Sequence, residues 1–427
     1  MSKSKWMMVV VLLVVVAAVT AGCGGSDGSS TGTGAGGGTA TADTSTASGK
    51  EAVKLGVIME ARPEVEPWSA AWHDSLEKLS QQDGAISYKE AYNGYQPTQA
   101  QPLVQQLIGQ GYGVIVYSTF TLNDIARSLS KANPDVPAVV TSFDHPQPPN
   151  LSIGTTSYLQ IGYSTCWLLM KLSQSGKIGY VGSQPVPFDQ EIIRGCALGA
   201  KAANPSGKIL KAYTNSFTDL QKNQQQMQSL LDQGADTIYL SSGTEDVLGG
   251  LKLCEQKKVD CASWGSDIRR WAPNYGTFSA VLDWSPLLAK LVEQRRTKQP
   301  EAIQFDATYK NKMLVPQPFD GATGKRVPQN VQEEFNKMIA GLADGSIELP
   351  PSKATLVARD TRDRAAHSSS AGPAAPGLSL AAGAVLVDME GSSRRSAESW
   401  PRTTCRLTCA AARSMPSWAR TAPARRR

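Results

Sequence analysis

The sequence predicts an α/β protein of two doubly wound lobes. Short β-branched runs alternate with helical stretches of roughly 10–15 residues, which is the pattern of βαβ units around a parallel sheet. Right-handed crossovers then place helices on both faces of each sheet. The chain also contains two internally similar stretches, Leu107–Ser118 (LIGQGYGVIVYS) and Leu230–Ser241 (LLDQGADTIYLS). Each has the pattern of a helix end, a glycine turn, a buried strand and a serine. Any helix–glycine–strand unit can look like this, but two similar lobes in tandem explain the shared order of strands better.

The expected strands and helices fall in two sets. The first set of strands is Val53–Met59, Ile86–Tyr92, Val114–Ser118, Ala138–Phe143 and Ser152–Thr156, and the second is Ile178–Gly182, Ile209–Thr214, Thr237–Ser241 and Cys261–Gly265. Helices are expected at 68–82, 98–110, 121–132, 158–175, 190–204, 218–233 and 244–257. The folded body should span 51–352, with one lobe from about 51–160 and 277–310 and the other from about 161–276 and 311–352.

Charge and composition exclude several classes of protein. The formal net charge is +6, but residues 353–427 hold 13 basic and 5 acidic side chains, so residues 1–352 carry a net charge of −2. The body therefore has no basic surface for a nucleic acid. Three histidines in 427 residues argue against a histidine-rich metal site, and we expect neither a metal nor a cofactor.

The cysteines do not form the dense pattern of a small disulfide-stabilised scaffold, because seven are scattered along the chain. Cys254 and Cys261 lie across a helix–strand turn, where an exported domain permits a disulfide, and the sequence leaves that bond open. Cys166 lies in an apolar helix, and we expect both Cys166 and Cys196 to be core residues.

Residues 1–23 have the features of an export signal. Two lysines precede the apolar run Trp6–Val19, whose 14 residues are too few to span a hydrocarbon core of ~30 Å as a helix. The run ends in Thr20-Ala21-Gly22-Cys23, which resembles a bacterial lipoprotein signal, although the usual leucine is replaced by threonine. In that pattern Cys23 is lipidated and becomes the mature N-terminus. The alternative is an ordinary signal peptide with an incidental cysteine.

Two further segments should not contribute to the core. Residues 24–50 include 20 Gly, Ser or Thr among 27 residues, which predicts a flexible linker. Residues 353–427 use 12 arginines and 1 lysine, whereas residues 1–352 use 8 arginines and 22 lysines. This switch indicates a disordered Arg/Ala/Ser/Pro-rich tail, which is either translated out of frame from a GC-rich gene or a natural basic tail.

The residues that follow each strand are the candidates for a binding site, because open parallel sheets bind ligands beyond the carboxyl ends of their strands. These stretches are Glu60–Trp68, Ser118–Phe120, Phe143-Asp144, Ser183–Asp189, Asn215–Phe217, Ser241-Ser242 and Ser266-Asp267. They are rich in aromatic and hydroxyl side chains and contain a few carboxylates. They offer no nucleophile paired with a base, so we do not expect an enzyme.

Several stretches of the body match one family in their order and spacing. They are Lys54–Met59 (KLGVIM), Pro67–Trp72 (PWSAAW), Gly109–Ser118 (GQGYGVIVYS), Lys177–Ser183 (KIGYVGS), Thr214–Phe217 (TNSF), Asp232–Asp236 (DQGAD) and Gly265–Asp267 (GSD). Residues 52–350 therefore resemble the basic membrane protein family of bacterial lipoproteins, which bind purine nucleosides or related small molecules for ABC transporters. The resemblance implies a periplasmic-binding-protein type I fold, in which two lobes joined by a hinge close on a ligand in the cleft.

The resemblance also implies individual ligand contacts. The family stacks an aromatic residue near the start of the first helix on the base, which is Trp68 here, and Ser69 follows where asparagine is common. Asp267 matches the acidic residue that binds ribose in nucleoside binders. The lysine that often follows the return strand is missing from Val281–Trp284, so a nucleoside, a nucleobase and another ligand all stay open. The predicted ligand-binding set is Trp68, Ser69, Ser118, Phe120, Asn215, Phe217, Ser241, Asp267 and Trp284.

Each of the main candidates also has an ordinary structural explanation. Trp68 or Phe217 alone is more often a core residue. Asp267 can be the N-cap of a helix, because a short acidic side chain there accepts backbone N–H groups. Trp284 can be a packing residue at a helix entry. The position of these residues at strand ends is what favours a site.

The sequence thus predicts a lipid-anchored, extracytoplasmic solute-binding protein of a bacterial ABC importer. Its partners would be a small purine-like ligand, an ABC permease and the membrane that Cys23 reaches. One alternative is a binder of a non-purine small molecule. The other is a bilobal sensor or regulator, which would need a helix-turn-helix N-terminus where this chain has a signal segment.

Overall fold

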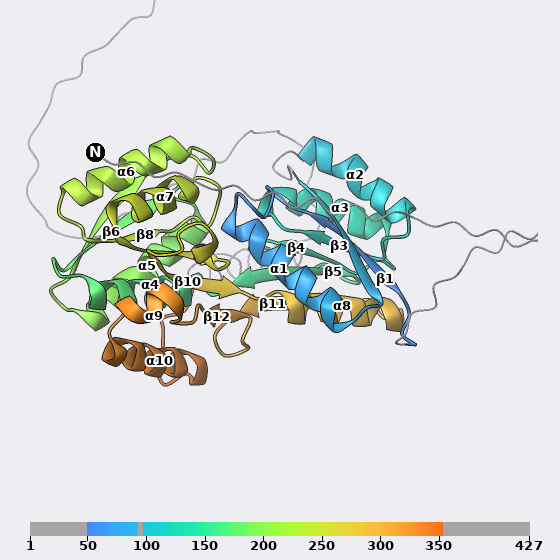
Figure 1. Ribbon diagram of the computed structural model, residues 1–427. Helices are drawn as coiled ribbons and strands as arrows, with labels where there is room; N and C mark the ends of the chain where they lie inside the picture. Colours follow the sequence, from blue (N-terminus) through green and yellow to red (C-terminus); the bar gives the residue numbers. More distant parts are fainter. Residues whose placement is uncertain (1–48, 93–96, 353–427) are drawn as a thin grey trace, which may run out of the picture. The chain divides into compact units, whose positions relative to one another are not determined.

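Two six-stranded sheets flanked by helices form the part of the chain that the computed structural model describes, residues 49–92 and 97–352 (Figure 1). The strand order is β11-β5-β4-β3-β1-β2 in the first sheet and β12-β10-β9-β8-β6-β7 in the second. Every pair in the first sheet is parallel, and in the second only β10 and β12 pair antiparallel. This architecture confirms the predicted α/β fold of two doubly wound lobes.

The elements keep the same order in both lobes. The strands are β1 (Val53–Ile58), β2 (Ile86–Ala91), β3 (Val114–Tyr117), β4 (Ala138–Thr141), β5 (Leu151–Thr156), β6 (Lys177–Gly182), β7 (Lys208–Tyr213), β8 (Thr237–Leu240), β9 (Asp260–Gly265), β10 (Gly276–Leu282), β11 (Gln304–Ala307) and β12 (Leu314–Pro316). The helices are α1 (Pro67–Gln82), α2 (Pro97–Gly109), α3 (Asn123–Ala132), α4 (Tyr158–Leu172), α5 (Pro187–Ala203), α6 (Leu220–Asp232), α7 (Val247–Lys257), α8 (Ser285–Thr297), α9 (Gly321–Arg326) and α10 (Gln329–Asp344), with 3-10 turns η1 (Phe120–Leu122) and η2 (Ile268–Arg270).

The central strands form where the sequence is β-branched and apolar. β3 (VIVY), β4 (AVVT) and β8 (TIYL) are buried at every position, as strands covered by helices on both faces must be. All nine predicted strands and seven predicted helices are present, with ends within three residues of the expected ones. The sequence analysis listed no strand or helix after residue 265, so it did not assign β10, α8, α9, α10 or the short edge strands β11 and β12.

Three crossings connect the lobes. The chain passes from β5 to α4, from β10 to α8, and from β11 to β12. The expected lobe boundary at 277 was wrong by a few residues, because β10 pairs with β9 and therefore belongs to the second sheet. Tyr309 in the third crossing exchanges a 2.7 Å hydrogen bond with Ser164 of α4, so this connection is anchored to the second lobe.

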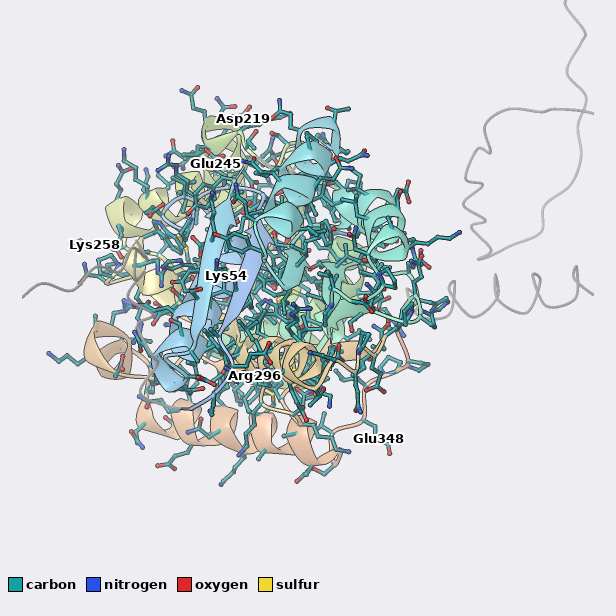
Figure 2. The ribbon with its side chains drawn as sticks, turned by 90° about the vertical axis from the view of Figure 1, so that its right-hand side faces the viewer. Lys54, Asp219, Glu245, Lys258, Arg296 and Glu348 are labelled. Carbon is teal, nitrogen blue, oxygen red and sulfur yellow. A yellow bond between two sulfur atoms is a disulfide. The ribbon has the colours of Figure 1, made fainter. Side chains whose placement is uncertain are left out.

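Helix α8 returns to the first lobe and is held there by a charged cluster. Arg296, labelled in Figure 2, pairs with Asp83 at 2.8 Å and donates to the carbonyl of Glu51. Lys50 pairs with the same carboxylate at 3.0 Å. These cations lower the pKa of Asp83 to about 2, with the Arg296 hydrogen bond as the main cause. Asp83 caps α1, so the cluster ties the end of α1 to α8.

Helices α4 and α5 cross at unusually short range. A Cβ atom added at Gly162 or Gly199 would collide with the backbone carbonyl of Ile192 or Tyr163, so only glycine permits this approach. A disulfide joins Cys166 and Cys196 across the same contact. Both cysteines are fully buried as expected, but the sequence analysis did not predict that they bond to each other.

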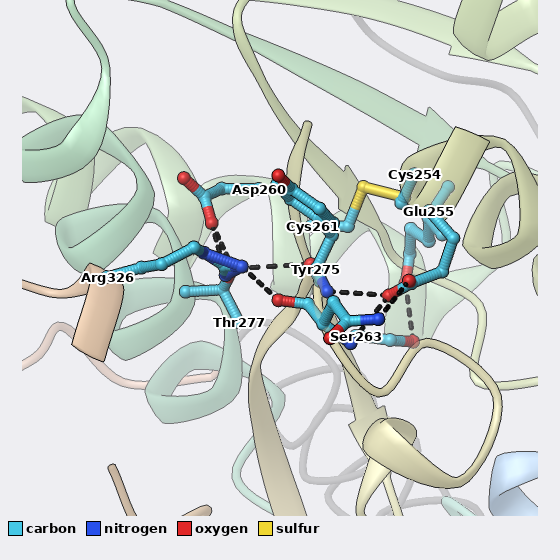
Figure 3. The surroundings of a disulfide bond; sticks show 10 residues. Cys254, Glu255, Asp260, Cys261, Ser263, Tyr275, Thr277 and Arg326 are labelled. Atoms are coloured by element: carbon cyan, nitrogen blue, oxygen red, sulfur yellow. Dashed lines mark hydrogen bonds and ion pairs between the residues drawn. A yellow bond between two sulfur atoms is a disulfide. The ribbon is translucent and has the colours of Figure 1, made fainter. Parts of the chain in front are cut away.

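A second disulfide joins Cys254 of α7 to Cys261 of β9, which settles the bond that the sequence left open (Figure 3). Polar contacts surround it. Glu255 accepts the backbone N–H of Tyr275 at 2.6 Å, and Arg326 of α9 donates to Asp260 at 2.6 Å. The disulfide therefore lies where α7, β9 and the segment leading to β10 meet.

The predicted lipidation site Cys23, the linker 24–50 up to residue 48, and the tail 353–427 lie outside the described residues. Within 49–92 and 97–352, none of the helices is both long and apolar enough to cross a membrane.

Candidate ligand-binding cleft

A cavity lies where the carboxyl ends of strands from both sheets come together. It contains about 660 Å³ of free space, counted with the open space at its mouth. Apart from one carboxylate, every lining residue carries either an aromatic ring or a hydroxyl group. The lining consists of seven aromatic residues (Trp68, Phe120, Phe143, Tyr158, Phe188, Phe217, Trp264), eight hydroxyl residues (Ser118, Thr119, Thr121, Thr141, Ser142, Thr155, Ser242, Thr244) and Glu60.

Four of the nine predicted ligand-binding residues line this cavity: Trp68, Ser118, Phe120 and Phe217. Trp68 enters from the first turn of α1, which begins with Pro67 at a position where the missing N–H costs nothing. Ser118 and Phe120 follow β3, and Phe217 follows β7. Their place at strand ends is what the sequence used to select them.

The other five predicted residues are not part of the cavity lining. The Ser69 hydroxyl donates to Glu66 within the first turn of α1, and Ser241 donates to Asp189 at 2.9 Å. Asn215 is exposed in a turn with φ of 54°, and Trp284 is fully buried against Trp72 with ring centres 4.6 Å apart.

Asp267, the predicted ribose contact, is occupied by protein groups in this structure. Its carboxylate accepts the backbone N–H of Arg269 at 2.9 Å, which caps η2, and also pairs with the Arg269 guanidinium at 2.5 Å. The cavity lining does not include it. The N-cap explanation thus describes this residue, because an arginine two positions later takes up the carboxylate.

Four tryptophans form a cluster at one side of the cavity, and two of them, Trp68 and Trp264, line it. Trp68 contacts Trp72, Trp264 and Trp284 edge to face, with ring centres 6.3, 5.7 and 5.8 Å away. Its indole N–H donates to the carbonyl of Ser118 at 2.9 Å. Such T-shaped pairs are favourable beyond simple burial. Because Trp68 belongs to the first lobe and Trp264 to β9 of the second, the cluster fixes one indole face of the cavity at the junction of the lobes.

Four of the other five aromatic rings form a continuous wall with Trp264. Tyr158 at the start of α4 lies 5.6 Å from Phe188, 5.7 Å from Trp264 and 5.9 Å from Phe143, measured between ring centres. Phe188 in turn lies 6.5 Å from Phe217. Burial, together with the charge of Glu60, raises the pKa of the Tyr158 phenol, so it stays protonated. A planar ligand would therefore meet uncharged aromatic faces in this part of the cavity.

Two buried hydroxyls in the first lobe's part of the cavity lining have no hydrogen-bond partner within the described part of the chain. They are Ser118 Oγ and Thr141 Oγ1, and both residues are buried. A buried polar group without a partner costs free energy, which a ligand or a water molecule in the cavity would recover. These two hydroxyls are the clearest polar contacts that the cavity offers from β3 and β4.

Two buried carboxylates lie just behind the second lobe's side of the cavity. Asp189 accepts from Tyr180 at 2.5 Å, Tyr213 at 2.8 Å and Ser241 at 2.9 Å, and burial raises the pKa of its carboxyl above the ordinary value. Asp246, at the N-terminus of α7, accepts from two residues of the lining, Ser242 and Thr244.

Direct contacts join the lobes beside the cavity. The backbone N–H of Trp68 donates to the carbonyl of Gly243 at 2.9 Å, so the start of α1 rests on the loop after β8. Arg270 of η2 pairs with Asp74 of α1 at 2.8 Å. The Trp271 indole donates to the carbonyl of Glu64 at 2.7 Å. The first turn of α1 is thus held by the second lobe.

No group of three or more His, Cys, Asp or Glu side chains suitable for a metal ion occurs in the described ranges. His73 instead shares a 2.8 Å hydrogen bond with Glu90.

The family comparison decides the class of this protein. The model of the Bmp family, described as "ABC transporter substrate-binding protein PnrA-like", matches residues 52–343. The chain belongs to this family. The family comprises substrate-binding proteins and not enzymes, so the predicted resemblance and the expectation of a non-enzymatic protein are both confirmed.

Individual relatives support this membership. A purine-binding protein of Brucella abortus is 24% identical over 245 residues, which are 56% of this chain and 68% of that protein. Basic membrane protein A1 of Borrelia garinii is 31% identical over 152 residues, 35% of this chain and only 44% of that protein. The solved structure of an ABC transporter solute-binding protein from Conexibacter woesei has a TM-score of 0.60 at 24% identity, and the match covers 70% of this chain and 99% of that one. The last comparison shows the fold.

The sequence analysis missed several lining residues. Tyr158 lies two residues after the end of β5, a strand for which the sequence analysis gave no candidate stretch, and Trp264 is the penultimate residue of β9. Thr141 and Thr155 are the last or penultimate residues of β4 and β5 and could have been found by extending the criterion inward by one or two positions.

Proposed function

We propose that this protein is an extracytoplasmic solute-binding protein that binds a purine base or nucleoside in the cleft and delivers it to an ABC permease. The observation that carries the proposal is the lining itself, in which seven aromatic side chains surround a cavity with a single carboxylate. An aromatic face gives a purine a large stacking area at a low cost in rotamer entropy.

Further support for a purine comes from the polar groups and from one relative. The hydroxyls of Ser118 and Thr141 can meet ring nitrogens or exocyclic groups, because a hydroxyl both donates and accepts. The Brucella abortus relative is named a purine-binding protein. We also propose that Cys23 is lipidated and that the Gly/Ser/Thr-rich residues 24–50 tether the binding domain to the membrane surface.

The experiment compares two exposed apolar residues. Phe120 lines the cavity and is 41% exposed, whereas Leu220 is 36% exposed and lies outside the lining. Phe120→Ala should therefore cost little stability but weaken binding of adenine or adenosine by ~1–3 kcal/mol, by analogy with base–aromatic stacking. Leu220→Ala is the control and should leave binding unchanged.

Ligand-induced shifts in melting temperature provide the first measurement, since a ligand that binds only the native state raises it. Adenine, hypoxanthine and their nucleosides should raise the melting temperature, and glucose and amino acids should not. Calorimetric titration then gives the affinities of the two variants. A shift with glucose and none with any purine would reject the purine and favour the alternative, a non-purine solute.

A further inference from the structure

Asp246 has its full capacity for hydrogen bonds occupied. One carboxylate oxygen accepts the hydroxyls of Ser242 and Thr244, each at 2.8 Å. The other accepts the Ser183 hydroxyl at 2.7 Å and the Asn223 amide N–H at 3.1 Å. A carboxylate offers about four lone-pair sites, and a protonated carboxyl would place a donor against these donors. Asp246 is fully buried, so water does not replace any of the four.

This arrangement fixes the protons of two cavity residues. Ser242 and Thr244 both line the cleft, and each hydroxyl has only one proton. Because that proton points to Asp246, each hydroxyl can offer only lone pairs to a ligand. The Ser242 oxygen also lies 3.5 Å from the backbone N–H of Thr244, which leaves it at least one further lone pair. The second lobe therefore presents acceptors and no donor at these two positions.

The first lobe differs in this respect. Ser118 Oγ and Thr141 Oγ1 have no partner among residues 49–92 and 97–352, so their protons are not committed. These hydroxyls can turn to donate or to accept. The fixed hydroxyl polarity of the lining is therefore on the second lobe, where both protons are held by Asp246.

We propose that Asp246 is a positioning residue that makes Ser242 and Thr244 acceptor-only contacts, so that the cleft prefers a purine with an exocyclic amino group to one with a carbonyl at the same place. The inference rests on the proposed purine ligand. An amino group can donate its two N–H protons to these oxygens. A carbonyl oxygen at the same place would put its lone pairs against the lone pairs of Ser242 and Thr244, with no proton to form a hydrogen bond. Buried polar groups that lack a partner are the usual source of strong discrimination between analogues.

The substitution Asp246→Asn tests the proton arrangement in a directed way. The new amide keeps the shape but replaces one acceptor oxygen by an NH₂ group. Facing Asn223, that NH₂ group would meet an amide N–H unless the whole Asn223 amide flips, whereas the hydroxyls of Ser242 and Thr244 need only rotate to accept from it. It will therefore face Ser242 and Thr244 and donate to them. Their hydroxyl protons are then released toward the ligand, and the preference should reverse.

The experiment measures Kd by calorimetric titration for two pairs, adenine with hypoxanthine and adenosine with inosine. Wild type should bind the amino member about tenfold more tightly, the effect of one hydrogen bond gained or lost. Asp246→Asn should bind the two members equally or favour the carbonyl one. Thr244→Val removes one of the two acceptors without changing shape and should reduce the wild-type preference. A loss of fold would show in the melting temperature of the unliganded variants.

Asp189→Asn is the matched control. Asp189 is equally buried in the same lobe and is also hydrogen-bonded by hydroxyls, but its donors Tyr180, Tyr213 and Ser241 do not line the cavity. It should keep the wild-type preference. If Asp246→Asn keeps that preference too, or if Asp189→Asn loses it to the same extent, the assignment of Asp246 is overturned while the purine ligand stands. If none of the four purines binds to the wild-type protein, both proposals fall.

Discussion

Two tryptophans one turn apart in α1 allow a hydrogen bond to be weighed separately from packing. Trp68 and Trp72 are both buried, and both pack against Trp284. The Trp68 indole N–H donates to the Ser118 carbonyl at 2.9 Å, whereas the Trp72 indole nitrogen has no partner in the described part of the protein. Replacing either residue by phenylalanine removes the same atoms but breaks a hydrogen bond only at Trp68.

The expected difference follows from these contacts. The losses of apolar area and the cavities left behind are similar for the two substitutions and largely cancel. Trp68→Phe in addition leaves the buried Ser118 carbonyl without its hydrogen-bond donor, which costs about 1–3 kcal/mol. Trp72→Phe removes an N–H group that was already unpaired. Trp68→Phe should therefore lower the free energy of unfolding by about 1–3 kcal/mol more than Trp72→Phe.

Urea denaturation followed by circular dichroism gives the two free energies, and calorimetric titration with adenine or adenosine gives the two affinities. Only Trp68→Phe should weaken binding, since Trp68 lines the cleft and Trp72 does not. Equal losses of stability, or a larger loss for Trp72→Phe, would refute the role given to the Trp68 hydrogen bond.

Three further predictions concern the disulfides, one carboxylate and the anchor. Replacing both Cys166 and Cys196 by alanine should destabilise the protein by about 1 kcal/mol more than replacing Cys254 and Cys261. Both pairs are fully buried, but the first has a sequence separation of 30 and the second of 7, and the longer loop loses more entropy when it is closed. Equal losses of stability in urea denaturation would contradict this chain-entropy argument. Asp83 has a pKa lowered to about 2 in the folded protein, so its contribution to the free energy of unfolding is complete above the unfolded pKa near 3.8 and is lost as the pH falls toward 2. The melting temperatures of wild type and Asp83→Asn should therefore differ at pH 6 and converge at pH 2. A constant gap between the two melting temperatures would show that ionisation of Asp83 is not involved. Cys23→Ser should release the protein from isolated membranes in a detergent-free wash, and a variant that stays membrane-bound would argue against lipidation.

The sequence predicted the fold well because the fold depends on local patterns. Buried strands such as β3 and β8 are short β-branched runs, and the glycine turns before them mark the helix ends. The edge strands β11 and β12 are short and partly polar, and their place depends on the sheet to which they are added rather than on their own residues. The lobe boundary near residue 277 was missed for the same reason, because β10 belongs to the second lobe only through its pairing with β9.

The site was predicted only in part because its members are selected by tertiary contacts. Strand-end position identified Trp68, Ser118, Phe120 and Phe217, but it does not show which way a side chain turns. Asp267 turns to Arg269 and Ser241 to Asp189, and neither choice is visible from spacing alone. The Cys166–Cys196 bond likewise depends on how closely α4 approaches α5.

The most direct test of the account is a crystal structure of the protein with the purine that most raises its melting temperature. The proposal predicts the purine ring in the cleft between the two lobes, against the rings of Trp68 and Phe217, with polar edges near Ser118 and Ser242. A purine bound elsewhere, or a cleft occupied by a different class of molecule that co-purifies with the protein, would contradict it.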